Sequence, residues 1–142
     1  MVRNRKSAKK AGASMETAVV NYLNWALDTD TIERRHLQGA KDTGDVSGVR
    51  FMGKRVVIEV KNKLPMNISE GLRQAEIERG NDDAAIGVAV QKRPGVGITS
   101  LAGQSQQLVC MTLETLAVIL NDGLPVGPDD GVDGLDEEAN SE

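Results

Sequence analysis

The segment Arg55–Lys61 constrains the fold most, because it joins a β-branched run to two charged side chains. Val56-Val57-Ile58 is typical of a central β-strand. Side chains alternate along a strand, so Glu59 and Lys61 share one face, about 7 Å apart, and their apolar neighbours face a core. Charges in a buried strand are costly unless they have partners or a chemical role. The alternative is a half-exposed strand whose charged face is solvated.

Hydrophobic periodicity and turn signals predict eight elements along the chain. Asn67 with Glu70 resembles a capping box, and Met52-Gly53-Lys54 resembles a tight hairpin connection. The expected elements are a helix over 14–27 with Ser14 as its N-cap, strands over 31–37, 45–52 and 55–61, a helix over 67–79, strands over 84–90 and 106–111, and a helix that Thr112 caps and that runs to Leu120. The order α-β-β-β-α-β-β-α predicts an α/β fold of the α+β type, with a mixed sheet flanked by helices.

Charge divides the chain into three parts. The net charge is −4, but residues 129–142 contain seven acids and no base, so residues 1–128 hold 17 bases against 14 acids, a net charge of +3. We expect a flexible basic arm over 1–12, one folded domain over 13–124 and a disordered acidic tail over 125–142. The acidic overall charge therefore does not exclude a nucleic-acid partner.

Cysteine and hydropathy exclude several classes of protein. The single Cys110 cannot form a disulfide framework or a cysteine zinc site, and its apolar neighbours predict a buried thiol. No apolar run approaches the ~18–20 residues that cross a bilayer, so we expect no membrane association. Residues 1–15 lack the apolar segment of a signal peptide, which predicts a cytoplasmic protein.

A hairpin would bring Asp45, at the start of one strand, close to Glu59 and Lys61 on the next. Phosphodiester hydrolysis needs carboxylates that hold Mg²⁺ against a phosphate oxygen, an activated water, and neutralisation of the charge that develops on phosphorus. Two carboxylates and an amine at one point can meet all three requirements. The lysine would orient or help to deprotonate the water and stabilise the transition state.

Asp45 followed by Glu59-Val60-Lys61 resembles the PD-(D/E)xK motif of nucleases with the restriction-endonuclease-like fold, whose α-β-β-β-α-β core order is similar to that expected over 14–91. Within this superfamily the chain is most similar to archaeal-type and phage-type Holliday junction resolvases. The sequence departs from the motif at one position, where Gly44 rather than proline precedes the aspartate.

The resemblance implies an active site of Asp45, Glu59, Lys61, Glu16 and Gln74, in which Asp45, Glu59 and Glu16 bind Mg²⁺, with Mn²⁺ able to substitute. It implies a homodimer that cleaves four-way DNA junctions. The short, acidic-tailed chain suggests an enzyme of a phage or a mobile element, and a phage enzyme would act in the host cytoplasm. Other repair-type or restriction-type nucleases, an exonuclease and a non-catalytic DNA-binding module remain alternatives.

Twelve Lys and Arg residues between positions 34 and 93 favour a protein that reads the DNA backbone and shape rather than bases. The residues expected to contact DNA are Arg3, Arg5, Lys6, Lys9, Lys10, Arg34, Arg35 and Lys63. We expect the acids Glu76 and Glu78 on a solvated helix surface and His36 on an exposed strand. The apolar positions Leu113, Leu116, Ala117 and Leu120 form a stripe that serves either the core or a dimer interface.

Overall fold

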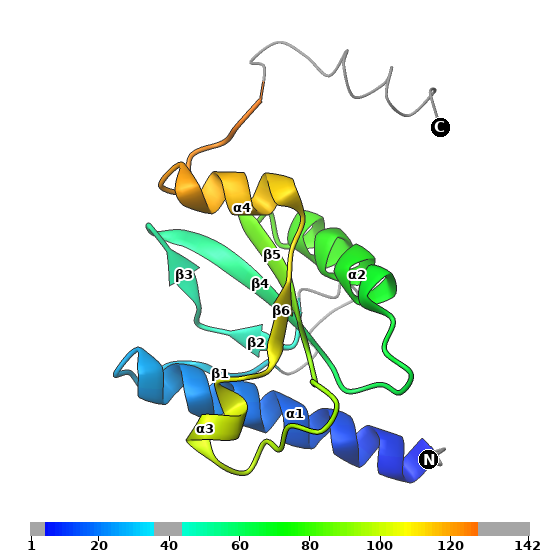
Figure 1. Ribbon diagram of the computed structural model, residues 1–142. Helices are drawn as coiled ribbons and strands as arrows, with labels where there is room; N and C mark the ends of the chain where they lie inside the picture. Colours follow the sequence, from blue (N-terminus) through cyan, green and yellow to red (C-terminus); the bar gives the residue numbers. More distant parts are fainter. Residues whose placement is uncertain (1–4, 36–43, 128–142) are drawn as a thin grey trace, which may run out of the picture.

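Residues 5–35 and 44–127 are described in the computed structural model, and they form a mixed sheet with helices on both faces (Figure 1). The elements are α1 (Arg5–Ala26), β1 (Glu33–Arg34), β2 (Val46–Ser47), β3 (Arg50–Phe51), β4 (Lys54–Lys61), α2 (Ile68–Asn81), β5 (Ile86–Gln91), α3 (Leu101–Gln104), β6 (Leu108–Cys110) and α4 (Leu113–Leu120). The predicted mixed α/β class is confirmed.

The sheet has the strand order β1-β2-β4-β5-β6, and β3 pairs with β4 beside this path. Strands β4 and β5 are parallel, with Glu59 opposite Ala89 and Lys61 opposite Gln91, and α2 connects them. The other pairs are antiparallel. Helix α1 lies against one face of the sheet and α2 against the other (Figure 1). The core on the α1 side is built from aliphatic side chains, among them Met15, Ile58 and Val88.

Local sequence signals locate several boundaries correctly. Met52 and Gly53 both have positive φ, as a two-residue hairpin turn between β3 and β4 requires. Asn67 caps α2, because its side-chain oxygen accepts a hydrogen bond from the backbone N–H of Glu70 at 3.0 Å. Thr112 caps α4 in the same way. These three predictions are confirmed.

Helix α1 begins at Arg5, nine residues before the predicted N-cap Ser14. Residues 5–12, expected as part of a flexible arm, are therefore its first turns. The segment is rich in Lys, Arg and Ala, which favour helices, and the single Gly12 does not break it. The clustered charges indicate a solvated arm, although the same residue types have a high helix propensity.

The strand predicted over 45–52 is broken into β2 and β3, which differs from the expected single strand. The break falls at Gly48, whose φ is +93°, and a Cβ atom there would lie 2.5 Å from the carbonyl oxygen of Thr31. Between the strands predicted over 84–90 and 106–111, where no element is expected, the chain forms the short helix α3. Neither the break at Gly48 nor the four-residue helix α3 produces a hydrophobic periodicity in the sequence from which it could be predicted.

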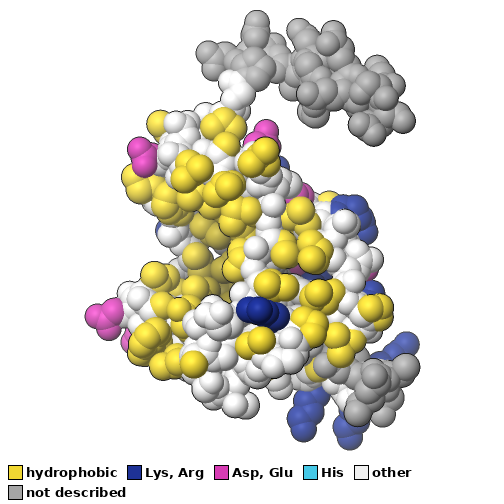
Figure 2. Space-filling model, in the orientation of Figure 1, with side chains coloured by type: hydrophobic (Ala, Val, Ile, Leu, Met, Phe, Trp, Pro, Cys, Tyr) yellow, Lys and Arg dark blue, Asp and Glu magenta, His cyan; other side chains and the backbone are white. Residues whose placement is uncertain are grey.

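The apolar stripe of α4 is exposed. Leu113 and Leu120 are 81% and 76% exposed, and Thr115 and Val118 are the buried residues of the helix. Figure 2 shows hydrophobic side chains gathered over α4. Cys110 is half-buried, so the predicted fully buried thiol is wrong. The stripe is thus a surface rather than part of the core.

Within the described residues, no helix is both long enough and apolar enough to span a membrane.

Candidate active site

Backbone hydrogen bonds place Asp45 beside the middle of β4. Its N–H donates to the carbonyl oxygen of Ile58 at 2.9 Å, and its carboxylate oxygen Oδ2 accepts from the N–H of Val60 at 2.8 Å. The preceding Gly44 has φ +101°, and a Cβ there would lie 3.0 Å from Val57 Cγ1 and 3.1 Å from the Ile58 oxygen. The chain therefore approaches β4 closely, and the Asp45 carboxylate is held in one place.

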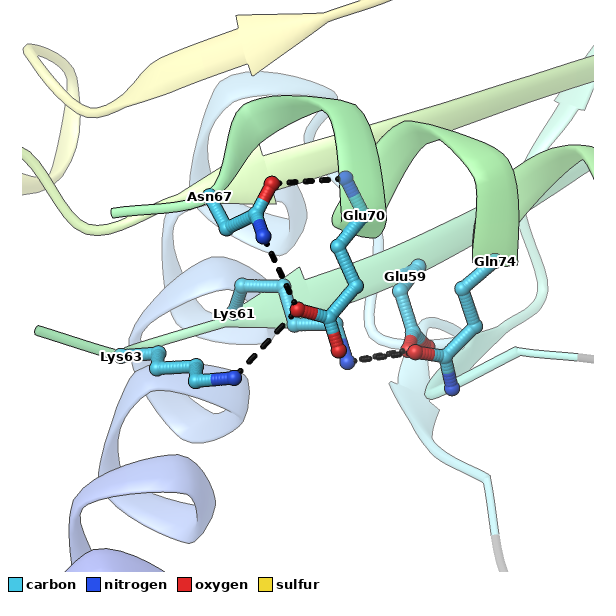
Figure 3. Close-up of polar contacts among 6 residues, drawn as sticks. All are labelled: Glu59, Lys61, Lys63, Asn67, Glu70 and Gln74. Atoms are coloured by element: carbon cyan, nitrogen blue, oxygen red, sulfur yellow. Dashed lines mark hydrogen bonds and ion pairs between the residues drawn. The ribbon is translucent and has the colours of Figure 1, made fainter. Parts of the chain in front are cut away.

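Glu59 and Lys61 share the face of β4 that packs against α2, as the alternation predicts. Lys61 Nζ lies 3.1 Å from Glu59 Oε2 and donates a 2.6 Å hydrogen bond to Gln74 Oε1 on α2 (Figure 3). Glu59 is only 3% exposed. The alternative of a solvated strand face is wrong for this glutamate. Gln74 points toward Lys61, so the structure brings these two predicted site residues together.

The two carboxyls expected to share a metal ion act on each other electrostatically. Burial raises the pKa of Glu59 to about 7 and the charge of Glu78 adds to the rise, whereas the interactions with the Asp45 side chain and with the Lys61 ammonium oppose it. Near neutral pH this carboxyl is thus poised between its charged and neutral forms.

Glu78 is a residue of the site that sequence reasoning missed. The prediction of a solvated surface position is wrong, because Glu78 is 1% exposed and its charge acts on Glu59. Gly71, Ala75 and Glu78 are the buried residues of α2, at helical spacing. The two small residues mark the helix face that packs closely on the sheet. That spacing was the signal that could have identified Glu78.

Glu16 lies near the site but is turned toward another partner. Its Oε1 accepts a 3.0 Å hydrogen bond from Arg34 Nε. Burial raises its pKa, and the charge of Asp45 adds to the rise, so the two carboxylates interact. In the described part of the chain, no three acidic, histidine or cysteine side chains form a ready metal-binding group. The predicted triad of Glu16, Asp45 and Glu59 is therefore not assembled.

The pair Asp45 and Glu59 nevertheless fits a hard divalent cation. Its donors are carboxylate oxygens, which Mg²⁺ prefers. When both carboxyls are ionised, no hydrogen-bond donor among residues 5–35 and 44–127 serves Glu59 Oε1, although this oxygen is buried. A buried ionised oxygen without a donor is costly, and a cation at this position would compensate for it.

The residues expected to contact DNA have different environments. Arg5, Lys6, Lys9 and Lys10 are exposed on the first turns of α1. Arg34 pairs with Glu16, and Lys63 Nζ lies 3.3 Å from Glu70 Oε2, as Figure 3 shows. Arg35 lines a small cavity. Arg3, His36 and the acidic residues 129–142 lie outside the described residues.

A scan of protein-family models and searches of curated proteins and of solved structures gave no match to this chain.

Proposed function

We propose that this protein is a Mg²⁺-dependent DNA endonuclease of the PD-(D/E)xK type that cuts branched DNA, with the four-way junction as its substrate. The observation that carries the proposal is that Asp45 is hydrogen-bonded to β4 on both sides of Glu59, through the Ile58 carbonyl and the Val60 N–H, with the Lys61 ammonium 3.1 Å from Glu59. A carboxylate pair beside an amine on a rigid central strand is the arrangement that metal-assisted phosphodiester hydrolysis needs.

Asp45 and Glu59 would hold the Mg²⁺, which when bound polarises the scissile phosphate and lowers the pKa of a bound water. The backbone N–H of Val60 donates to one oxygen of the Asp45 carboxylate, so the metal would bind a carboxylate whose orientation is already fixed. Glu59 and Gln74 hold Lys61 from two sides, so its ammonium can orient the attacking water and stabilise charge on the phosphate.

A basic helix surface lies next to this site. Lys9 and Lys10 lie three and four residues after Lys6, which places them on the same side of α1 as Lys6. Directly after Lys10, the carbonyl oxygen of Ala11 accepts a 3.2 Å hydrogen bond from the side chain of Asn62, the residue after Lys61. The basic turns of α1 therefore lie beside the strand end that carries the lysine, where they could bind the phosphates of a substrate.

Cleavage of a symmetric junction requires two incisions, which a two-fold dimer can deliver. Leu113, Leu116 and Leu120 of α4 and Val109 of β6 are large apolar side chains left exposed. Charged residues are absent from 106–111, so nothing in the edge strand opposes association. We include a homodimer through α4 and β6 in the proposal.

The test is a cleavage panel in which one protein preparation meets a four-way junction, a flap, a linear duplex and single-stranded DNA, with Mg²⁺ and with excess EDTA. The expected result is paired, symmetric nicks on the junction that EDTA abolishes. Asp45→Asn should lower the cleavage rate by more than about 100-fold. Mutation of residues that only orient metal ligands already lowers metal affinity or activity by about 10- to 100-fold.

Asp28→Asn is the matched control, since Asp28 is exposed at the end of α1 and its φ of +52° suits asparagine. It should cleave at the wild-type rate. Equal cleavage with and without EDTA would refute the metal-dependent mechanism. Junction binding without cleavage by either protein would show a non-catalytic binding module, and degradation from DNA ends would show an exonuclease.

A further inference from the structure

A small cavity of about 100 Å³ lies on the sheet where the strand is broken between β2 and β3. Gly48 and Val49 form the break, and the N–H of Val56 donates to the carbonyl oxygen of Val49 at 3.1 Å. Gly48 passes so close to the Thr31 carbonyl that no side chain fits there. The cavity is therefore a consequence of the backbone path rather than of a side-chain rotamer.

Three arginines from different segments line this cavity, which we call the arginine pocket: Arg35 after β1, Arg50 in β3 and Arg55 in β4. Among the described residues of the lining, the one acid is Asp82 at the C-terminal end of α2, and Arg55 Nη1 lies 3.0 Å from Asp82 Oδ1. These lining residues thus carry three positive charges and one negative charge. Gathering like charges in a confined space is unfavourable unless an anion balances them.

Guanidinium groups favour one class of ligand. Each presents several N–H donors in a planar fork that fits the oxygens of a phosphate group. Arg55 is 54% exposed, so its guanidinium can be reached from solvent while one edge stays on Asp82. Arg50 is also exposed and makes one 3.3 Å bond to the carbonyl oxygen of Gly53. The pocket therefore combines phosphate-binding groups with an open approach.

The arginine pocket and the candidate active site share the α2 face of the sheet. Asp82 lies one helical turn beyond Glu78 on α2, and Arg55 lies four residues, about 13 Å, from Glu59 along β4. The backbone N–H of Arg35 donates to the carbonyl oxygen of Asp45 at 2.8 Å. One DNA segment could therefore reach both places.

We infer that Arg35, Arg50 and Arg55 bind a phosphate of the DNA backbone near the cleaved bond, an inference that rests on the proposed function for the identity of the ligand. This phosphate fixes the position of the strand and carries no base information. The ligand of the arginine pocket is a phosphate group. It could belong to the DNA backbone or to a free phosphate ion, and the experiment distinguishes these two sources.

The experiment uses the full chain in EDTA, so that no DNA is cut, and compares wild type with Arg50→Gln. Binding of a short DNA duplex is measured over a range of salt concentrations. Loss of one phosphate contact should reduce the slope of log K against log salt by about 0.9. Arg73→Gln is the control with the same charge change on an exposed position of α2, and its slope should equal that of wild type. Thermal unfolding checks that each variant is folded.

Titration with inorganic phosphate, followed through the NMR signals of the arginine Nε–H groups, separates the two sources. Saturable shifts of Arg35, Arg50 and Arg55 that Arg50→Gln weakens would support the pocket. A reduced salt slope for Arg50→Gln without such shifts would show that the arginine pocket binds phosphates of the DNA backbone and not the free ion. Shifts with an unchanged slope would overturn the DNA assignment, and no shift with an unchanged slope would overturn the pocket. If the wild-type protein binds no DNA, the proposed function fails. The phosphate titration still decides whether the arginine pocket binds phosphate.

Discussion

The chemistry of single residues in the candidate site depends on burial. Glu59 and Lys61 could be predicted from alternation within a β-branched run, and the position of Asp45 from the hairpin that follows it. Glu78 was not predicted, because an acid in an amphipathic helix is ordinarily solvated; its spacing from the small residues Gly71 and Ala75 was the one signal for it. The charge of Asp45 acts on Glu16, yet the Glu16 carboxylate accepts a hydrogen bond from Arg34, a pairing across 18 residues that the sequence does not encode locally.

The first prediction concerns Glu59. Its folded-state pKa of about 7 exceeds the ordinary 4.5, so between these values the folded protein binds more protons than the unfolded chain. The free energy of unfolding in EDTA should therefore fall, by at most about 3 kcal/mol, as pH rises through this window. Mg²⁺ requires the ionised carboxylate, so metal affinity and cleavage should rise through about pH 7.

Thermal unfolding between pH 4.5 and 8 checks this prediction, with Glu59→Gln as the reference that cannot titrate. The difference between the two proteins isolates this one carboxyl from the other acids. A difference that does not change with pH would contradict the raised pKa.

The second prediction concerns Glu78, whose charge raises the pKa of Glu59. Glu78→Gln removes that charge, so the pH midpoint of cleavage should move to lower pH. Glu76→Gln is the matched control, because Glu76 pairs with Arg79 on the same helix and should leave the midpoint in place. Identical pH profiles for wild type and Glu78→Gln would show that Glu78 does not act on the site.

At the scale of elements, the predictions succeeded where the cause is local. Asn67 and Thr112 satisfy backbone donors within one helical turn, and the turn at Met52-Gly53 joins adjacent strands. They failed where the cause is a long-range contact. The break at Gly48 results from the close approach of the Thr31 carbonyl, 17 residues earlier in the chain. A pattern in the local sequence does not reveal such a long-range contact.

Two glycine substitutions should have effects of opposite sign. Gly12 lies inside α1 with open space around its Cβ position, so Gly12→Ala should stabilise the fold by about 1 kcal/mol. Gly48→Ala forces a side chain into a positive φ and against a carbonyl, and it should cost about 2 kcal/mol or more. Chemical denaturation measures both. No gain from Gly12→Ala would contradict a helix that begins at Arg5.

At the scale of the whole molecule, the exposed apolar surface of α4 and β6 predicts association. Leu113→Glu together with Leu120→Glu should convert a dimer into a monomer with little loss of monomer stability, since both side chains are exposed. Sedimentation equilibrium measures the mass. Leu27→Glu, at a leucine that is 59% exposed directly after α1, is the control that should remain dimeric. A wild-type protein that sediments as a monomer would refute this part of the proposal.

The conformation of Gly44 bears on how proteins of this design can be recognised. Proline is confined to φ near −65°, whereas residue 44 has φ +101°. A Pro-Asp pair therefore cannot follow the route by which this chain brings Asp45 to β4. Under the proposed function, glycine before the aspartate is a distinct geometric solution rather than an eroded form of the proline-containing motif. A sequence pattern that demands proline at this position would overlook any chain that uses the same route.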